Sequence, residues 1–119
     1  MSYIPAFWTV LNHFFQKKKT LQSAKNGRCV VFENSGPSGF AIYHDGVKTI
    51  KFYTEAGGGN CIFYISIPSE QNWEKDTGYS LEKRNEVLAF IADESLKKQA
   101  RIPGAYFKIN ETSIVFYTL

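Results

Sequence analysis

The pair Asp45-Gly46 lies between two runs of strand-forming residues, 40–44 (FAIYH) and 47–54 (VKTIKFYT). Asp-Gly readily adopts the positive φ angles of a type I′ turn, a common two-residue connection between antiparallel strands. The sequence therefore predicts a β-hairpin at this point and an antiparallel sheet around it. The expected cross-strand partners are His44 and Val47, Ile42 and Thr49, and Phe40 and Lys51.

Four other runs have the same strand character, with β-branched and aromatic residues bounded by Gly, Pro, Ser or Asn. The connections between them carry turn residues, such as Ser35-Gly36-Pro37-Ser38-Gly39 and Asn110-Glu111-Thr112. Short connections between consecutive strands favour antiparallel neighbours. We therefore predict a mainly antiparallel sheet of about six strands. The four further strands are 28–33, 61–67, 105–109 and 113–118.

Two segments have helical periodicity instead. Residues 5–24 begin with Pro5 and carry apolar side chains at helical spacing, and Asn26-Gly27 is a typical helix stop. Residues 81–100 follow Ser80, a plausible N-cap, and end before Pro103-Gly104. The predicted apolar stripes are Phe7, Val10, Leu11, Phe14 and Leu21 in the first helix, and Leu81, Leu88, Ile91, Ala92 and Leu96 in the second.

These elements predict an α+β fold with the order α-β-β-β-β-α-β-β and both helices on one face of the sheet. The chain has 119 residues, which is the usual size of a single domain. No composition shift or repeat divides it, so we expect residues 1–119 to form one domain.

Residues 68–79 (PSEQNWEKDTGY) lack a clear periodicity and are predicted to be a long loop. Loops of this length in a small domain often carry function. This loop would present Trp73 and Tyr79. Phe90 falls opposite the apolar stripe of the following helix, where an outward aromatic ring can anchor a partner. The alternative is that Trp73 folds back onto the sheet and that Phe90 packs beneath the loop.

Aromatic residues make up 16% of the chain, and seven of them are Tyr. A tyrosine joins an apolar ring to a polar hydroxyl, which suits a half-exposed binding surface. We therefore add Tyr43, Tyr64 and Tyr106, all in predicted strands, to the candidate binding residues. An alternative is a ligand-binding or enzymatic pocket between the sheet and the loop, lined by Tyr64, Tyr106 and Trp73.

Catalytic and metal-binding patterns are weak. Cys29, Cys61, His13 and His44 are scattered one to an element, without the close spacing of a metal site or a local nucleophile motif. The glycine run 57–59 leads into a strand rather than into a helix, so it does not match a phosphate-binding loop. We therefore expect no catalytic residue, no metal and no cofactor.

The net charge of +3 is unevenly distributed. Residues 1–51 contain seven Lys or Arg residues against two acidic ones, and lysines beside aromatic strand residues can bind single-stranded nucleic acid. The first helix could also lie on a membrane surface. Neither is our expectation, because no nucleic-acid motif accompanies the lysines and an amphipathic helix on a sheet is far commoner. The N-terminus lacks a basic signal-peptide region, so we expect a cytoplasmic protein.

The element order, and the stretch from Trp73 through Arg84 to the terminal hairpin, resemble small bacterial immunity-type proteins. The resemblance implies a protein partner, such as a toxin, and no residue role is carried over from it. We therefore expect a small non-catalytic interaction protein that uses an aromatic sheet face and the 68–79 loop. We also consider a homodimer, because exposed strand edges allow one.

Overall fold

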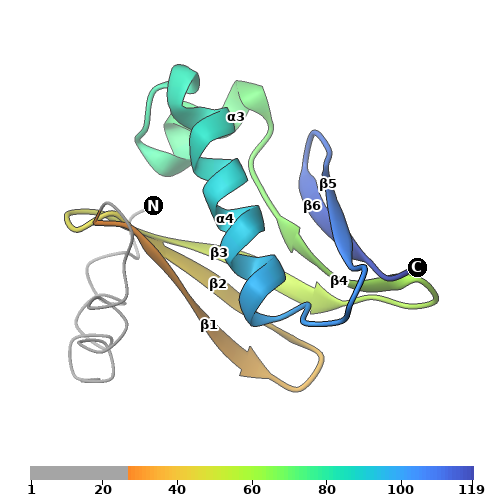
Figure 1. Cartoon of the computed structure of the whole chain (residues 1–119). Coiled ribbons are helices and arrows are strands. Elements are labelled where there is room, and N and C mark those ends of the chain that lie inside the picture. Colours follow the sequence, from red (N-terminus) through yellow and green to blue (C-terminus); the bar gives the residue numbers. More distant parts are fainter. Residues whose placement is uncertain (1–26) are drawn as a thin grey trace.

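The computed structural model describes residues 27–119, so the predicted helix over 5–24 lies outside the described residues. Six strands form one antiparallel sheet with the order β1-β2-β3-β4-β6-β5, and two helices follow β4 (Figure 1). The predicted α+β class and six-stranded antiparallel sheet are confirmed. The elements are β1 Cys29–Ser35, β2 Ser38–His44, β3 Thr49–Ala56, β4 Cys61–Ser66, α3 Glu70–Thr77, the 3-10 helix η1 Leu81–Lys83, α4 Arg84–Lys98, β5 Tyr106–Ile109 and β6 Ser113–Tyr117.

The hairpin between β2 and β3 forms where the sequence predicts it, but the predicted register is wrong by two residues. His44 lies opposite Thr49 rather than Val47. The reason is the Asp45 side chain, whose Oδ1 accepts the backbone N–H groups of Val47 at 2.8 Å and Lys48 at 2.6 Å. These bonds close a four-residue loop. Because side chains alternate with a period of two, every strand residue still keeps its predicted face.

The sheet consists of two halves that meet over a short stretch. Strands β1, β2 and β3 pair along almost their full lengths, and β4 pairs with β6, which pairs with β5. In contrast, β3 and β4 pair only between Thr54–Ala56 and Phe63–Ile65. The first half of β3 and the end of β4 therefore separate, as Figure 1 shows. The helix α3 lies at this opening, and a pocket of about 340 Å³ borders Thr77 there.

The prediction that residues 68–79 form a loop is wrong, because they contain α3. The helix ends at Gly78, which has a φ of +80° and donates its backbone N–H to the Glu74 carbonyl. Such a left-handed residue is a common helix C-cap. Only Trp73 and Thr77 are buried in α3, so the segment has no apolar stripe for a periodicity search to find. Packing of Trp73 into the core holds this helix in place.

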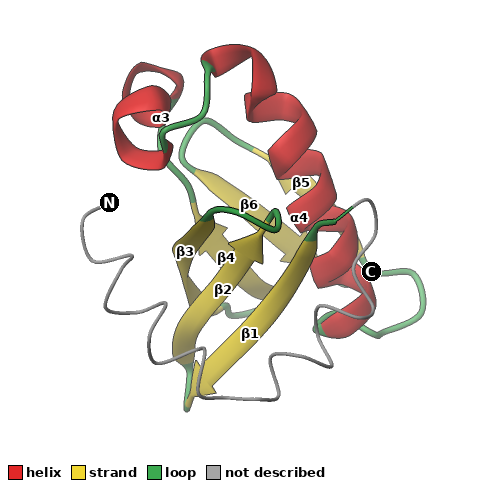
Figure 2. Cartoon of the chain, turned by 90° about the vertical axis from the view of Figure 1, so that its left-hand side faces the viewer, coloured by secondary structure: helices red, strands yellow, loops and turns green. Residues whose placement is uncertain are grey.

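The predicted helix over 81–100 is confirmed as η1 followed by α4. Both α3 and α4 lie on one face of the sheet (Figure 2). The prediction placed the helix over 5–24 beside α4, and that helix lies outside the described residues, whereas α3 was not predicted. The residues of α4 that face the sheet are buried at helical spacing, as an amphipathic helix requires. They are Val87, Leu88, Ile91, Ala92 and Ser95.

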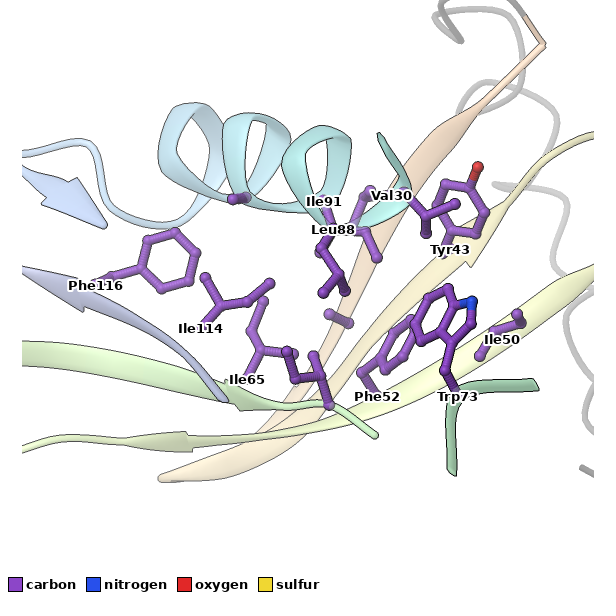
Figure 3. Close-up of a cluster of buried hydrophobic side chains, with 14 of the residues drawn as sticks. Val30, Tyr43, Ile50, Phe52, Ile65, Trp73, Leu88, Ile91, Ile114 and Phe116 are labelled. Atoms are coloured by element: carbon purple, nitrogen blue, oxygen red, sulfur yellow. The ribbon is translucent and has the colours of Figure 1, made fainter. Parts of the chain in front are cut away.

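The core between the sheet and the two helices contains side chains from both halves of the sheet (Figure 3). Trp73 lies in it with no solvent exposure, and its Nε1–H donates to the Ser80 carbonyl at 3.0 Å. Phe32 of β1 and Phe63 of β4, one from each half, have ring centroids 6.4 Å apart. The core is therefore continuous across the short β3–β4 pairing. In the part of the chain from 27 to 119, no helix has the length and hydropathy that a membrane crossing requires.

Candidate binding face

The six candidate binding residues do not form one surface. They are Trp73, Tyr79, Phe90, Tyr43, Tyr64 and Tyr106. Trp73, Tyr79, Tyr43 and Phe90 follow one another on the helix-covered side of the sheet. Ring centroids are 6.4 Å apart between Trp73 and Tyr79, 6.2 Å between Tyr79 and Tyr43, and 6.0 Å between Tyr43 and Phe90. Tyr43 and Trp73 are buried, whereas Tyr79 and Phe90 are half-buried. This row of rings belongs mainly to the core, so the expectation of an exposed Trp73 is wrong.

A hydrogen bond to the β2–β3 loop holds Tyr79, the second ring of this row. The Tyr79 hydroxyl donates to Asp45 Oδ2 at 2.5 Å. Burial, together with the neighbouring Asp45 carboxylate, raises the pKa of Tyr79 above the ordinary tyrosine range, and burial also raises the pKa of Tyr43. Burial acts to raise the pKa of Asp45 too, but hydrogen bonds from Tyr79, Lys48 and Val47 outweigh it and lower that pKa. Both tyrosines therefore stay protonated, and Tyr79 supports the β2–β3 loop through its hydrogen bond to Asp45.

A pocket of about 300 Å³ opens beside these groups and is bordered by Arg28, Glu86 and Lys83. Two of its charged groups, Arg28 and Glu86, contact each other. The Arg28 guanidinium lies 3.4 Å from the Glu86 carboxylate and 4.4 Å above the Phe90 ring centroid. Phe90 therefore packs against Arg28 and Tyr43 and does not point freely outward as predicted. We assign this pocket a structural role.

Tyr64 and Tyr106 lie on the opposite side of the sheet, which we call its outer face. In β4, Ile65 points to the core, so its neighbour Tyr64 points away from the helices. The same alternation places Tyr106 outward, next to the core residue Phe107. The predicted pocket lined by Tyr64, Tyr106 and Trp73 is therefore wrong, because the sheet separates both tyrosines from Trp73.

Two tyrosines that the sequence analysis did not single out join them. Tyr53 on β3 and Tyr117 on β6 also point to the outer face, and the four tyrosines lie across β3, β4, β6 and β5. We call this surface the tyrosine face. Tyr53 and Tyr106 are each 41% exposed, and Tyr64 and Tyr117 are half-buried. Strand alternation alone would identify each outward tyrosine, but only the strand order brings β6 and β5 next to β4.

The hydroxyls and rings of the tyrosine face are held by specific contacts. Glu55 Oε1 accepts hydrogen bonds from the hydroxyl of Tyr53 at 3.2 Å and from that of Tyr64 at 3.1 Å. The hydrogen bond to Glu55, followed by the charge of that carboxylate, raises the pKa of Tyr64. Tyr106 and Tyr117 stack with centroids 5.3 Å apart. The face is therefore ordered before any partner arrives.

Lysines accompany the aromatic rings on the outer face. Lys108 Nζ lies 5.8 Å from the ring centroid of Tyr117, and Lys51 Nζ lies 4.0 Å from that of Phe40. Both distances are within the range of cation–π attraction. The outer face thus offers aromatic rings, hydroxyls, amines and the carboxylates of Glu33 and Glu55.

The structure also brings together one of the scattered cysteine–histidine pairs. Cys29 lies directly opposite His44 in the β1–β2 ladder, and Thr49 Oγ1 is 2.9 Å from His44 Nδ1. Both Cys29 and His44 are 2% exposed, so a substrate cannot reach the thiol in this conformation. Within residues 27–119, no group of three or more His, Cys, Asp or Glu side chains is placed to hold a metal ion.

Comparison of the chain with protein-family models, with curated proteins and with solved structures finds no match. The resemblance to immunity-type proteins therefore gains no support from these comparisons and stays a hypothesis.

Proposed function

We propose that this chain is a small non-catalytic binding protein that engages a protein partner through the tyrosine face. The observation that carries the proposal is the row of Tyr53, Tyr64, Tyr117 and Tyr106 across four neighbouring strands, with Tyr53 and Tyr106 each 41% exposed. Tyrosine is enriched in the residues that dominate binding energy at protein interfaces. Trp73 of the 68–79 segment is not part of the proposed binding surface, because its side chain is buried.

The contacts within the tyrosine face favour tight binding. Ordering a free side chain on association costs about 0.5–1.5 kcal/mol. Here the hydrogen bonds to Glu55 and the stacking of Tyr106 on Tyr117 already restrict the rings. The ring edges bury apolar area while the hydroxyls remain able to bond a partner. Such a surface suits a partner patch that is apolar in the centre and polar at its rim.

An immunity-type protein that blocks a toxin is one version of this function, with the cytoplasm as the expected compartment. A second copy of the chain is another version of the partner. Strand β5 lies at the free edge of the sheet and holds the exposed Tyr106 and Ile109, which would continue an interface beyond the flat face.

The test compares two pairs of substitutions. Tyr53→Ser with Tyr106→Ser alters the tyrosine face, and Leu81→Ser with Ile102→Ser alters two similarly exposed residues outside the sheet. Proteins retained from the source cell by the immobilised native chain are compared with those retained by each variant, and sedimentation measures self-association. We expect the tyrosine pair to weaken association at least about ten-fold, as loss of interface anchors does. Equal retention of partner proteins by all three chains would show that the tyrosine face is not the binding surface.

A second function is favoured by the lysines over the aromatic rings. Lys51 on Phe40 and Lys108 on Tyr117 could contact phosphates while bases stack on the rings. The acidic Glu55 in the middle of the face opposes this function. A labelled single-stranded oligonucleotide of about 12 nucleotides, titrated by fluorescence anisotropy, should bind at low salt and dissociate as salt rises. Absence of binding at low salt removes this alternative.

A further inference from the structure

Strand β3 has two edges, and its main-chain groups alternate between them, as in any antiparallel ladder. Ala56 donates its backbone N–H to the Pro37 carbonyl at 2.6 Å, on the β2 side. The next residue, Gly57, donates its backbone N–H to the Ile62 carbonyl at 3.0 Å, on the β4 side. The even-numbered residues of β3 therefore bond to β2, and the odd-numbered residues direct their N–H and C=O groups toward β4.

Only one end of the β4-side edge is paired with β4. The β3–β4 ladder joins Thr54–Ala56 to Phe63–Ile65. One step further, Tyr53 would lie opposite Ser66, but the ladder stops before that pair. In the part of the sheet that residues 27–119 form, the main-chain groups of Tyr53 and Ser66 that face each other across this gap are therefore not joined in a ladder.

The course of the chain after β4 explains the separation. Ile67 donates its backbone N–H to the Thr112 carbonyl at 3.0 Å, and Arg84 Nη2 donates to the Pro68 carbonyl at 2.9 Å. Both contacts hold the segment after Ser66 beside the β5–β6 hairpin and α4, away from β3. Proline also has no N–H group with which to continue a ladder. The separation of β3 and β4 is therefore built into the fold.

A pocket of about 340 Å³ occupies this separation, which we call the β3–β4 opening (Figure 1). The residues of β3 that border it are consecutive, 50–53, so they belong to both faces of the strand. A pocket that borders both faces of a strand lies along the edge of that strand. Ser66 and Ile67 border it from the end of β4, and Asp76 and Thr77 border it from α3.

The charge available at the β3–β4 opening is negative. Two charged residues border the pocket, Lys51 and Asp76. Lys51 Nζ lies 3.9 Å from the Glu33 carboxylate and 4.0 Å from the Phe40 ring centroid, so this amine is directed toward β1 and β2. No hydrogen bond or ion pair from the described residues, 27–119, engages the Asp76 carboxylate. A cation in the opening would therefore meet a carboxylate that can pair with it.

We propose that the β3–β4 opening binds an extended, basic peptide segment of a partner protein, which adds to the edge of β3. The main chain of the peptide bonds to that of Tyr53, as in other complexes in which a peptide extends a sheet. A lysine or arginine of the peptide pairs with Asp76. The edge of β3 from 49 to 53 is about 17 Å long, so five or six extended residues match it.

This site is separate from the proposed binding function of the tyrosine face and does not rest on it. The two surfaces adjoin, because Tyr53 borders the β3–β4 opening and also contributes its ring to the tyrosine face. However, the opening recognises its peptide through main-chain atoms and Asp76, whereas the tyrosine face acts through side chains on the outer face of the sheet.

Amide hydrogen exchange of the full chain, followed by nuclear magnetic resonance, tests the pairing. The probe is a capped hexapeptide of alternating valine and lysine. In the free chain we expect the amide of Tyr53 to exchange at least about ten-fold faster than those of Phe52 and Thr54, which bond to β2. At saturating peptide, exchange at Tyr53 should slow at least about ten-fold. Slow exchange in the free chain, or no binding and no added protection, would overturn the proposal.

Charge reversal tests the recognition of a basic segment. Since an exposed ion pair contributes up to about 1 kcal/mol, we expect Asp76→Lys to raise the Kd of the hexapeptide about five-fold, measured by titration calorimetry. The matched control, Glu82→Lys, makes the same change of charge at an exposed residue of η1 outside the pocket and should leave the Kd unchanged.

Circular dichroism confirms that each variant is folded, and Asp76→Asn replaces Asp76→Lys if the latter unfolds. A capped hexapeptide of alternating valine and glutamate should bind at least about ten-fold more weakly than the lysine peptide. Equal binding of the two peptides, or equal effects of the Asp76 and Glu82 substitutions, would show that Asp76 does not select a basic segment and would overturn the proposal.

Discussion

At the scale of single residues, the same side-chain type has different roles on the two faces of the sheet. Tyr79 lies among core rings and donates its hydroxyl to Asp45, where burial is the main cause of its raised pKa. Tyr64 lies on the outer face, and its pKa is raised mainly by the hydrogen bond to Glu55. Tyr79 is thus part of the structure that supports a loop, whereas Tyr64 is available to a partner.

Asp45 is the residue on which the β2–β3 loop depends. Replacing it by Ala removes the acceptor for the Val47 and Lys48 amides and for the Tyr79 hydroxyl. Since hydrogen bonds to a charged group contribute about 1.5–3 kcal/mol, we expect Asp45→Ala to lower the free energy of unfolding by about 2 kcal/mol at neutral pH. Urea denaturation measures this, with the exposed Asp93→Ala as the control.

The Asp45 contribution should also depend on pH. Its pKa is lower in the folded chain, so the stabilisation is complete above the unfolded-state pKa of about 3.9 and disappears as pH falls through the folded-state value. The difference in unfolding free energy between the native chain and Asp45→Ala should therefore shrink below about pH 4. A difference that stays constant to pH 2 would contradict this role.

At the scale of elements, Arg84 connects the start of α4 to two distant segments. Its Nη2 donates to the carbonyls of Pro68 and Glu111, both at 2.9 Å, and its guanidinium lies 5.9 Å from the Trp73 ring centroid. The side chain is buried, so these carbonyls would have no comparable donor if it were removed. Arg84 therefore fixes α4 relative to the end of β4 and the β5–β6 hairpin.

We expect Arg84→Ala to lower the free energy of unfolding by about 3 kcal/mol, because it removes two hydrogen bonds from a buried charged group together with its packing against Trp73. The exposed Arg101→Ala is the matched control and should change stability by less than about 0.5 kcal/mol. Urea denaturation followed by circular dichroism measures both. A loss for Arg84→Ala no larger than that for Arg101→Ala would show that α4 is held by its apolar face alone.

At the scale of the whole molecule, one core joins the two halves of the sheet despite their short pairing. Side chains from β1–β3, from β4–β6 and from both helices meet in it (Figure 3). We therefore expect unfolding in one cooperative step. In a Trp8→Phe variant, the fluorescence of Trp73 and the far-ultraviolet circular dichroism should show the same urea midpoint. Separate midpoints would contradict the predicted single domain.

Only part of the candidate site could be predicted from the sequence, because the tyrosine face depends on the order of the strands in the sheet. Alternation within each strand places Tyr64 and Tyr106 on one face, and this needs only neighbouring residues. The row formed with Tyr53 and Tyr117 depends on β6 lying between β4 and β5. That strand order arises from contacts between residues far apart in the sequence, which no local pattern contains.

Local sequence was sufficient for the six strands, the helix α4 and the antiparallel class, because turn residues and side-chain periodicity act between near neighbours. Tertiary structure decided what depends on distant contacts. It made 70–77 helical without an apolar stripe and buried Trp73 in the core. Backbone preferences are properties of short segments, whereas burial of a side chain is settled only by the surfaces that other segments place around it.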